Sequence, residues 1–382
     1  HTFLFSDNLT IEEEIELKER AQKNGLLMMG PGCGTAIING VGIGFSNVIN
    51  RGPIGVVGAT GTGLQEVTCL INNLGSGITH AIGVGGRDLS EGVGGIMTLE
   101  SLKMLQNDDK TEVLIIISKP PSATVADKII DAIGESKKPT VVCFLGNDFS
   151  VRNDENILFA STLEEAVLGA LQYVNKNGKK SNLHPKKSLK KYSEKIISLL
   201  KPSQRYVRGL YSGGTLCYEA QQILTPILGE IYSNAPLNKR YKLKNSYLSQ
   251  GHTCVDLGEE EFTLGHPHPM IDATIRNERL IQEASDPNVS VILFDMVLGY
   301  VASPDPAGDI LSAIKDAKNI SERQGRSLAF ISHVCGTEHD PQNLRVQMNK
   351  LRKEGVQVFA SNALASKVAG WIANRGVGDL NT

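Results

Sequence analysis

Short runs of apolar residues alternate with amphipathic segments along most of the chain. The runs are nearly continuous in Val, Ile, Leu and Ala, which predicts strands buried on both faces of a parallel sheet. An antiparallel sheet with one wet face would instead alternate residue by residue. In the first half we predict strands at 54–57, 79–84, 112–117, 139–145 and near 157–159, and helices at 62–74, 97–106, 122–134 and 162–175. This order predicts a doubly wound α/β domain.

The second half of the sequence repeats this plan. A predicted strand at 206–211 and a helix at 214–227 correspond to 54–57 and 62–74. Three further strand blocks and a final helix block follow in the same order. The second-half segments TCVDLGEEEF, VSVILFDMVLG, SLAFISHVC and VFASNALASKVAGWI correspond, in turn, to the first-half segments HAIGVGGRDL, EVLIIISKPP, PTVVCFLGN and LFASTLEEAVLGAL. We therefore predict two like domains, each with its own doubly wound sheet.

The composition of residues 176–202 separates the two halves, because this stretch is rich in Lys and poor in large apolar residues. It is typical of a solvated linker with a short helix. Near the start, 8–23 predicts a helix capped by Asn8 or Thr10, with Glu residues in its first turn. We divide the chain into 1–24, the end of an upstream Rossmann-like domain, a first domain at 25–175, a linker at 176–202 and a second domain at 203–382.

The overall charge and the cysteines limit the function classes. Lys plus Arg number 39 and Asp plus Glu 41, so no whole-chain field favours nucleic acid or an acidic membrane. The chain has no apolar run of 18 residues and no signal-peptide pattern, which indicates a cytoplasmic protein. The six cysteines are spread singly without a CxxC pair, and we expect them to be buried thiols.

The two strand–turn–helix elements are candidate anion sites. Each turn places Gly and Thr or Ser where a helix begins, so free N–H groups and the positive end of the helix dipole meet at the turn. Neither has the GK[ST] of a Walker loop or the complete dinucleotide fingerprint. The alternative is that any parallel-sheet domain needs tight turns at these places. The candidate phosphate-binding residues are Thr60, Gly61, Thr62 and Gly63 in the first copy and Ser212, Gly213, Gly214 and Thr215 in the second.

The Gly-rich loop at 83–95 and the end of strand 112–117 fall at the same carboxyl edge of the predicted sheet. Gly85 and Gly86 permit close backbone approach, and Arg87 beside Asp88 offers a forked cation for a carboxylate or phosphate. Lys119 adds a second cation there. The alternative for the loop is a crossover with a surface Arg–Asp pair.

The segment GHPHPMID carries His266 and His268, each followed by Pro. This stiff extended spacing differs from the i, i+4 histidines of helical zinc sites, and no cysteine stands beside them. The alternative is that Glu259, Glu260 or Glu261 completes a metal site, but such an acidic run is typical of a solvated face, so we predict no metal. Proton transfer or phosphate contact by one of the two imidazoles is the expected role.

The blocks GPGCGT, GATGTGLQE, GVGGRDLS, SKPP, YSGGTL and GHPHPMID together resemble the FdrA family, a branch of the succinyl-CoA synthetase superfamily. The resemblance covers essentially the whole chain. It implies two flavodoxin-like domains, the first similar to the second domain of the synthetase alpha subunit and the second similar to the last domain of the beta subunit. It also implies that a CoA-binding Rossmann domain lies upstream, so CoA is a cofactor only if that domain binds it. In the synthetases, the two corresponding helices grip a phosphohistidine.

The phosphohistidine does not carry over to this sequence. The loop FLGNDFSVRNDENILFA lacks a histidine, and SKPP replaces the partner glutamate loop. The resemblance implies instead a subunit of an oxamate carbamoyltransferase in purine and allantoin catabolism, with carbamoyl phosphate as a ligand and other subunits or a second copy as partners. In that hypothesis Arg87 clamps an anion and His266 or His268 shuttles a proton. The alternatives are an acyl-CoA ligase acting through a phosphorylated intermediate and a non-catalytic scaffold.

Overall fold

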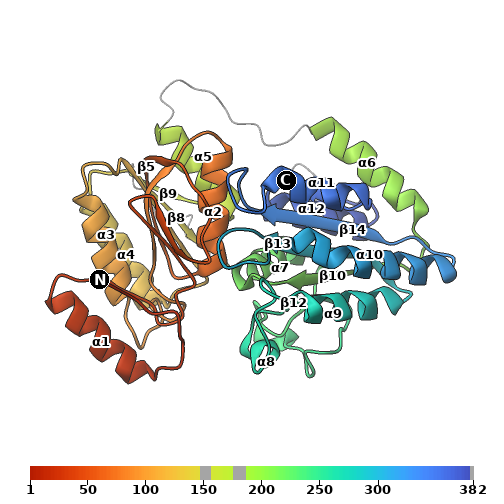
Figure 1. Ribbon diagram of the computed structural model, residues 1–382, viewed down its shortest axis with the longest axis horizontal. Helices are drawn as coiled ribbons and strands as arrows, with labels where there is room; N and C mark the ends of the chain where they lie inside the picture. The colour runs from red at the N-terminus through yellow and green to blue at the C-terminus, as the bar shows by residue number, and fades with distance from the viewer. Residues whose placement is uncertain (147–155, 175–185, 379–382) are drawn as a thin grey trace. The chain divides into compact units, whose positions relative to one another are not determined.

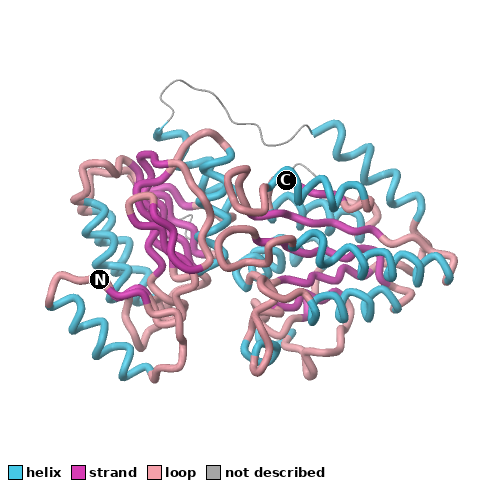
Figure 2. The backbone as a smooth tube through the Cα atoms, in the orientation of Figure 1, coloured by secondary structure: helices cyan, strands magenta, loops and turns pink. Residues whose placement is uncertain are grey.

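The computed structural model describes residues 1–146, 156–174 and 186–378, and the chain forms two compact units (Figures 1 and 2). The first comprises His1–Ser181 with Gly299–Val301, and the second comprises Asn182–Leu298 with Ala302–Thr382. The expected boundary after residue 175, the first part of the 176–202 linker and most of the histidine-free loop lie outside the described residues.

The first unit contains a seven-stranded sheet and its covering helices. The order along this sheet is β4-β3-β6-β5-β7-β8-β9, and β6, β5, β7, β8 and β9 run parallel. Its elements are β1 (Thr2–Phe3), α1 (Ile11–Lys23), β2 (Met28–Met29), β3 (Thr35–Ile38), β4 (Val41–Gly44), β5 (Arg51–Gly58), α2 (Gly61–Asn73), β6 (Ile78–Gly83), α3 (Ile96–Gln106), β7 (Val113–Ser118), α4 (Ala123–Gly134), β8 (Thr140–Phe144), β9 (Ile157–Phe159) and α5 (Leu163–Val174).

The five parallel strands confirm the predicted doubly wound sheet. Successive strands lie in the order 2-1-3-4-5, so the direction of winding reverses between β5 and β7. Helices α2 and α5 pack against each other on one face, and α3 and α4 pack on the other (Figure 1). Every residue of β7 is buried, as a central strand covered on both faces requires.

The β3–β4 hairpin is an element that the sequence analysis missed. Its strands pair antiparallel through Ile38 and Val41, and β3 also pairs antiparallel with β6. The connecting Asn39 and Gly40 have φ angles of +49° and +78°, as a tight two-residue turn requires. The Asn-Gly pair between apolar residues was the available sequence signal.

The second unit has a six-stranded, all-parallel sheet. Its order is β11-β12-β10-β13-β14-β15, which repeats the 2-1-3-4-5 winding with β11 added at one edge. Its elements are α6 (Lys186–Leu199), β10 (Tyr206–Tyr211), α7 (Gly214–Leu228), β11 (Ile231–Tyr232), the 3₁₀ turn η1 (Lys239–Tyr241), β12 (His252–Asp256), α8 (Glu260–Thr263), α9 (Thr274–Ser285), β13 (Val289–Val297), α10 (Pro306–Arg323), β14 (Ala329–Cys335), α11 (Leu344–Lys353), β15 (Gln357–Phe359) and α12 (Asn362–Ala373).

The core of the second unit forms around β13, whose nine residues are all buried. Helices α7 and α12 pack together on one face of the sheet, and α9, α10 and α11 pack on the other. The six cysteines of the chain are buried and none forms a disulfide, which confirms the expectation of buried thiols. None of the helices in the described part of the chain has the length and apolar character needed to cross a bilayer.

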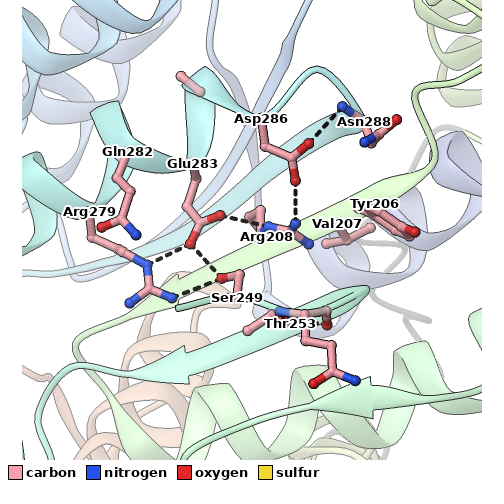
Figure 3. A network of polar contacts seen from close by, with 12 residues as sticks. Tyr206, Val207, Arg208, Ser249, Thr253, Arg279, Gln282, Glu283, Asp286 and Asn288 are labelled. Atoms are coloured by element: carbon pink, nitrogen blue, oxygen red, sulfur yellow. Dashed lines mark hydrogen bonds and ion pairs between the residues drawn. The ribbon is translucent and has the colours of Figure 1, made fainter. Parts of the chain in front are cut away.

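A buried network of charges ties α9 to β10 in the second unit (Figure 3). Arg208 donates to Glu283 Oε2 at 2.6 Å and to Asp286 Oδ2 at 2.8 Å. Arg279 donates from Nε to Glu283 Oε1 at 2.5 Å and from Nη2 to Ser249 Oγ at 2.8 Å. Arg208 lies near the start of β10, whereas the candidate turn follows its end. This network therefore stabilises the fold and lies away from the candidate site.

Helix α1 is fixed to the first unit by a buried ion-pair cluster. Thr10 caps the helix in a capping box with Glu13, which decides between the two expected caps. Lys18 Nζ donates to Glu14 Oε1 and to Asp88 Oδ1, both at 2.7 Å, and to the Val84 carbonyl at 3.0 Å. The side chains of Lys18, Glu14 and Asp88 are completely buried.

Candidate anion-binding site

The turn between β5 and α2 is the first of the two candidate anion sites. Thr60 caps α2, and its Oγ1 accepts from the Gly63 N–H at 3.2 Å. The N–H groups of Gly61 and Thr62 have no intrahelical acceptor at this helix end and form no hydrogen bond with another described residue. Four residues, 60–63, were expected to bind phosphate at this turn. Two of them, Gly61 and Thr62, thus have N–H groups that could donate to a ligand.

Lys119 follows the strand next to this turn. Gly58 of β5 is paired with Ile117 of β7, and Ala59 N–H donates to the Ile117 carbonyl at 3.2 Å. Thr60 and Lys119 are each two residues beyond this pair, at the point where the winding of the sheet reverses. Lys119 is half-buried and has no hydrogen bond or ion pair with another described residue. Ligands of open α/β sheets bind at this kind of crevice.

The segment 30–36 closes one side of the same edge. A Cβ built on Gly61 would lie 3.6 Å from Thr35 Oγ1 and 3.8 Å from Gly34 Cα. Gly85 has a φ of +89°, and a side chain there would collide with the backbone of Pro31. The glycine at 85 is therefore explained by packing within the chain, whereas a ligand contact by Gly86 stays a prediction.

Arg87 and Asp88 make contacts within the chain that the sequence analysis did not expect, and their roles with a ligand stay predictions. Arg87 donates from Nε to Glu14 Oε2 at 3.0 Å and from Nη2 to the Leu9 carbonyl at 2.9 Å. Asp88, besides binding Lys18, accepts from Thr98 N–H at 2.9 Å and from Thr98 Oγ1 at 2.6 Å, at the start of α3. Both side chains are thus engaged in holding α1 and α3. The reason is that the buried Lys18 and Glu14 need partners of opposite charge.

The corresponding turn of the second unit already holds a carboxylate of the chain. Asp295, from the neighbouring strand β13, accepts from the Ser212 N–H at 2.8 Å, from Ser212 Oγ at 2.9 Å and from the Gly213 N–H at 2.7 Å. The expected roles of Ser212 and Gly213 as phosphate donors are corrected accordingly. Any ligand at this turn would be limited to Gly214 and Thr215, whose roles stay predictions.

Arg276 is the charged partner of Asp295. Its Nη1 donates to the Asp295 carbonyl at 2.8 Å and lies 3.7 Å from Asp295 Oδ1, and both side chains are buried. Burial raises the pKa of Asp295, while Arg276 and the donors of Ser212 and Gly213 oppose the rise. Burial likewise lowers the pKa of Arg276, and the Asp295 charge opposes that change. The pair is therefore interdependent, and each charge stabilises the other.

The two expected histidines have different surroundings. His268 is half-buried, and its Nδ1 accepts from the Met270 N–H at 3.2 Å. A Cβ built on Gly258 would lie 2.8 Å from His268 Nε2 and 3.2 Å from Asp256 Oδ1, so this imidazole sits beside the end of β12. His266 is exposed. Proton transfer by either ring stays a prediction, and His266 is the more exposed of the two.

The pH dependence of stability tests the placement of His268. Burial, followed by repulsion from Arg276, lowers its pKa from 6.5 to about 4. As the pH falls, the imidazole is therefore protonated in the unfolded chain before it is protonated in the folded chain. The stability contributed by the neutral ring is present above pH 6.5 and is lost as the pH falls towards 4. We expect His268→Gln to reduce the slope of unfolding free energy against pH by up to about 1.4 kcal/mol per unit in this window. Urea unfolding at pH 7, 6 and 5 measures the slope.

His266→Gln is the matched control for this experiment, because it removes the exposed neighbour of the same segment. His252, whose pKa is also lowered to about 4 by burial and then by Arg208, leaves a residual slope of the same sign in either variant. An unchanged slope in His268→Gln would contradict the buried placement of the ring.

Sequence reasoning missed Asp295, Arg276, Lys18 and Glu14. A single Asp inside the apolar strand VSVILFDMV was a usable signal, since a buried carboxylate needs a specific partner. Glu14 and Lys18 are spaced i, i+4, which signals a helical ion pair but not its burial. Within the described residues, no three His, Cys, Asp or Glu side chains are grouped so that they could hold a metal ion.

Models of known protein families match part of each unit. A CoA-ligase family model matches residues 210–372, and a CoA-binding domain model matches residues 50–146. The second match lies in the first unit, although the sequence analysis expected CoA-binding features only upstream. The FdrA assignment stays a prediction.

Three relatives show how far the likeness extends. The uncharacterised protein YahF of Escherichia coli strain K12 is 42% identical over 362 residues, which cover 95% of this chain and 70% of YahF. The ADP-forming sulfoacetate-CoA ligase subunit SqwL of Acholeplasma sp is 30% identical over 149 residues, covering 37% of this chain and 48% of SqwL. The alpha subunit of the ADP-forming succinate–CoA ligase of Aquifex aeolicus is 27% identical over 119 residues, covering 30% and 38%. The chain thus matches less than half the length of each ligase subunit. It belongs to the family of YahF, a family with CoA-ligase and CoA-binding domains that is related to the succinyl-CoA synthetases.

Proposed function

We propose that this chain is a subunit of an acyl-CoA synthetase-like enzyme and that the amino end of α2 binds the phosphoryl group of an acyl phosphate. The observation that carries the proposal is the pair of N–H groups of Gly61 and Thr62, which form no hydrogen bond with another described residue, at the same sheet edge as Lys119, which likewise has no partner among the described residues. A helix N-terminus attracts an anion through these donors and through its dipole. Lys119 supplies the full positive charge that the dipole alone does not.

The finer proposal is that the acyl phosphate is carbamoyl phosphate. In the direction of synthesis, the amide nitrogen of oxamate attacks the carbamoyl carbon, the bond from that carbon to the phosphate oxygen breaks, and oxalurate and phosphate form. The nitrogen loses one proton, which the released phosphate takes up. Donors aimed at the departing phosphate would stabilise its growing charge. The absence of a histidine from the sequence at 144–160 fits a direct transfer without a phosphohistidine.

A second candidate function is CoA ligation through a phosphorylated intermediate. The names of two relatives, both ADP-forming CoA ligase subunits, favour it. In that reading ATP phosphorylates a histidine of this chain, and of the two expected histidines His266 is the exposed one. A scaffold without catalysis is the third reading, and it predicts no binding of phosphorylated ligands.

Replacing Lys119 by alanine tests the proposed site. We expect carbamoyl phosphate and inorganic phosphate to bind at least about tenfold more weakly, because a charge-assisted contact of about 1.5–3 kcal/mol is lost. Isothermal titration calorimetry at two salt concentrations measures the effect. The matched control is Lys128→Ala, which removes an exposed lysine of α4, the helix that follows β7. Equal affinity in the wild type and Lys119→Ala would exclude Lys119 from the site.

The reaction itself separates the three functions. The full-length protein with its partner subunits is incubated with oxalurate and phosphate, or with ATP, CoA and a carboxylic acid. Carbamoyl phosphate formed in the first mixture supports the transferase. Phosphorylation of His266 in the second mixture, seen by mass spectrometry, supports the ligase and contradicts direct transfer. Neither product, together with no ligand-induced rise in melting temperature, supports the scaffold.

A further inference from the structure

The first unit contains a cavity of about 460 Å³ that lies away from the candidate anion site. Residues of β2, the β3–β4 hairpin, β6 and the end of α3 line it, with Phe3 and His1 at the chain start. The end of α3 precedes β7, so this part of the cavity belongs to the amino edge of the parallel strands, whereas Thr60 and Lys119 follow their carboxyl ends. The volume is in the range of pockets that bind small molecules.

The lining is mostly apolar. Met29, Ile38, Ile43, Ile82 and Met104 contribute aliphatic and thioether groups to the walls. Such walls favour an aliphatic body, because its transfer from water is favourable in proportion to the apolar area buried. Specificity must then come from the few polar groups that reach the cavity.

His80 and Asp108 form a polar pair at the cavity wall. The Asn39 N–H donates to His80 Nδ1 at 3.1 Å, so the neutral ring carries its proton on Nε2. Burial lowers the pKa of His80, which keeps the ring neutral at pH 7. His80 Nε2 lies 3.9 Å from Asp108 Oδ2, too far for a direct hydrogen bond.

This spacing suits one bridging oxygen. A hydroxyl oxygen placed about 2.8 Å from each atom would accept from His80 Nε2–H and donate its own proton to Asp108 Oδ2. Thr111 Oγ1 already donates to the same Asp108 oxygen at 2.6 Å, which orients the carboxylate and leaves its second lone pair for the ligand. Hydrogen bonds hold Asp108 in its charged form and lower its pKa, although its partial burial opposes this.

We propose that this cavity binds a small aliphatic alcohol, whose hydroxyl bridges His80 and Asp108 and whose chain lies against the apolar walls. A carboxylate in the same place would face the Asp108 charge. An ammonium would direct its protons at the His80 N–H. The pair thus selects a neutral hydroxyl over either charged end group.

The test uses 1-octanol as the probe and the 382-residue chain, with binding measured by isothermal titration calorimetry. We expect 1-octanol to bind at least about tenfold more tightly than octanoate, because the carboxylate loses a hydrogen bond and meets a like charge. Asp108→Asn should reduce this preference to less than about threefold. Ile43→Trp should weaken 1-octanol binding at least tenfold by filling the cavity. Val41→Trp, at the exposed end of the same strand, is the matched control and should leave it unchanged.

Thermal unfolding of each variant establishes that it is folded, and Ile43→Phe replaces Ile43→Trp if the larger residue is not tolerated. No binding of 1-octanol up to its solubility limit would overturn the proposal. Equal binding of 1-octanol and octanoate would overturn the role of the His80–Asp108 pair. Binding that survives in the folded Ile43 variant would place the alcohol elsewhere.

Discussion

Replacing Lys18 by methionine is expected to lower the free energy of unfolding of the first unit by about 3–5 kcal/mol. The ammonium group is completely buried between Glu14 and Asp88, at 2.7 Å from each. Its removal leaves two carboxylates without a cation between them, and of these two Arg87, 41% exposed, pairs with Glu14 and not with Asp88. Methionine fills a similar volume, so the loss measures the charge rather than a cavity. Urea unfolding followed by circular dichroism measures the change.

Lys23→Met on the same helix is the matched control. Its partner Glu19 is also i, i+4 related, but the two side chains are 75% and 51% exposed at a distance of 3.5 Å. A solvent-exposed pair of this kind contributes about 0–1 kcal/mol. A similarly small effect for Lys18→Met would mean that the buried cluster does not hold α1 against the sheet.

Replacing Asp295 by alanine is expected to cost the second unit a similar amount, about 3–5 kcal/mol. Its carboxylate accepts three hydrogen bonds from Ser212 and Gly213, and it balances the buried Arg276. Without it, two buried backbone donors lose their acceptor, and the buried guanidinium keeps the carbonyl of residue 295 but loses the charge that balances it. Asp295→Asn keeps the shape but has only one accepting oxygen, so we expect an intermediate loss. Chemical unfolding of both variants gives the order.

Glu338→Ala is the control within the second unit, because the Glu338 and Arg345 side chains form an exposed ion pair at 3.1 Å. We expect this substitution to change stability by less than about 1 kcal/mol. If Asp295→Ala were as mild, the Ser212–Gly213 turn would not depend on Asp295. It would then be available to a ligand as the sequence predicted.

The fold was predictable because its signals are local. The buried strands β5, β7 and β13 are continuous apolar runs, and β10 has the predicted bounds, Tyr206–Tyr211. The β3–β4 hairpin was missed although Asn39-Gly40 and the β-branched residues beside it signal it, because the glycines at 40, 42 and 44 interrupt the apolar strand pattern. The order of the strands in each sheet does not follow from the residues of any one strand, since pairing depends on contacts between distant segments.

The candidate site was predictable only where its chemistry is local. The capped start of α2 was found because Thr60 and its glycines are adjacent in sequence. The partner of Arg87 was not predicted because Glu14 is 73 residues away, and the partner of the second turn was not predicted because Asp295 is 83 residues from Ser212. A buried charge pairs with a polar or charged group that the fold places beside it, and the spacing of residues along the chain does not reveal which group that is.

The two strand–turn–helix elements are expected to differ in solution, because the N–H groups of Gly61 and Thr62 have no acceptor among the described residues, whereas Asp295 accepts from the equivalent turn of the second unit. Amide chemical shifts in a ¹⁵N-labelled, deuterated sample, titrated with carbamoyl phosphate, test both halves of this proposal together. We predict that the resonances of Gly61 and Thr62 shift in a saturable way and that those of Ser212 and Gly213 do not. Shifts at Ser212 and Gly213 with Gly61 and Thr62 unchanged would contradict it.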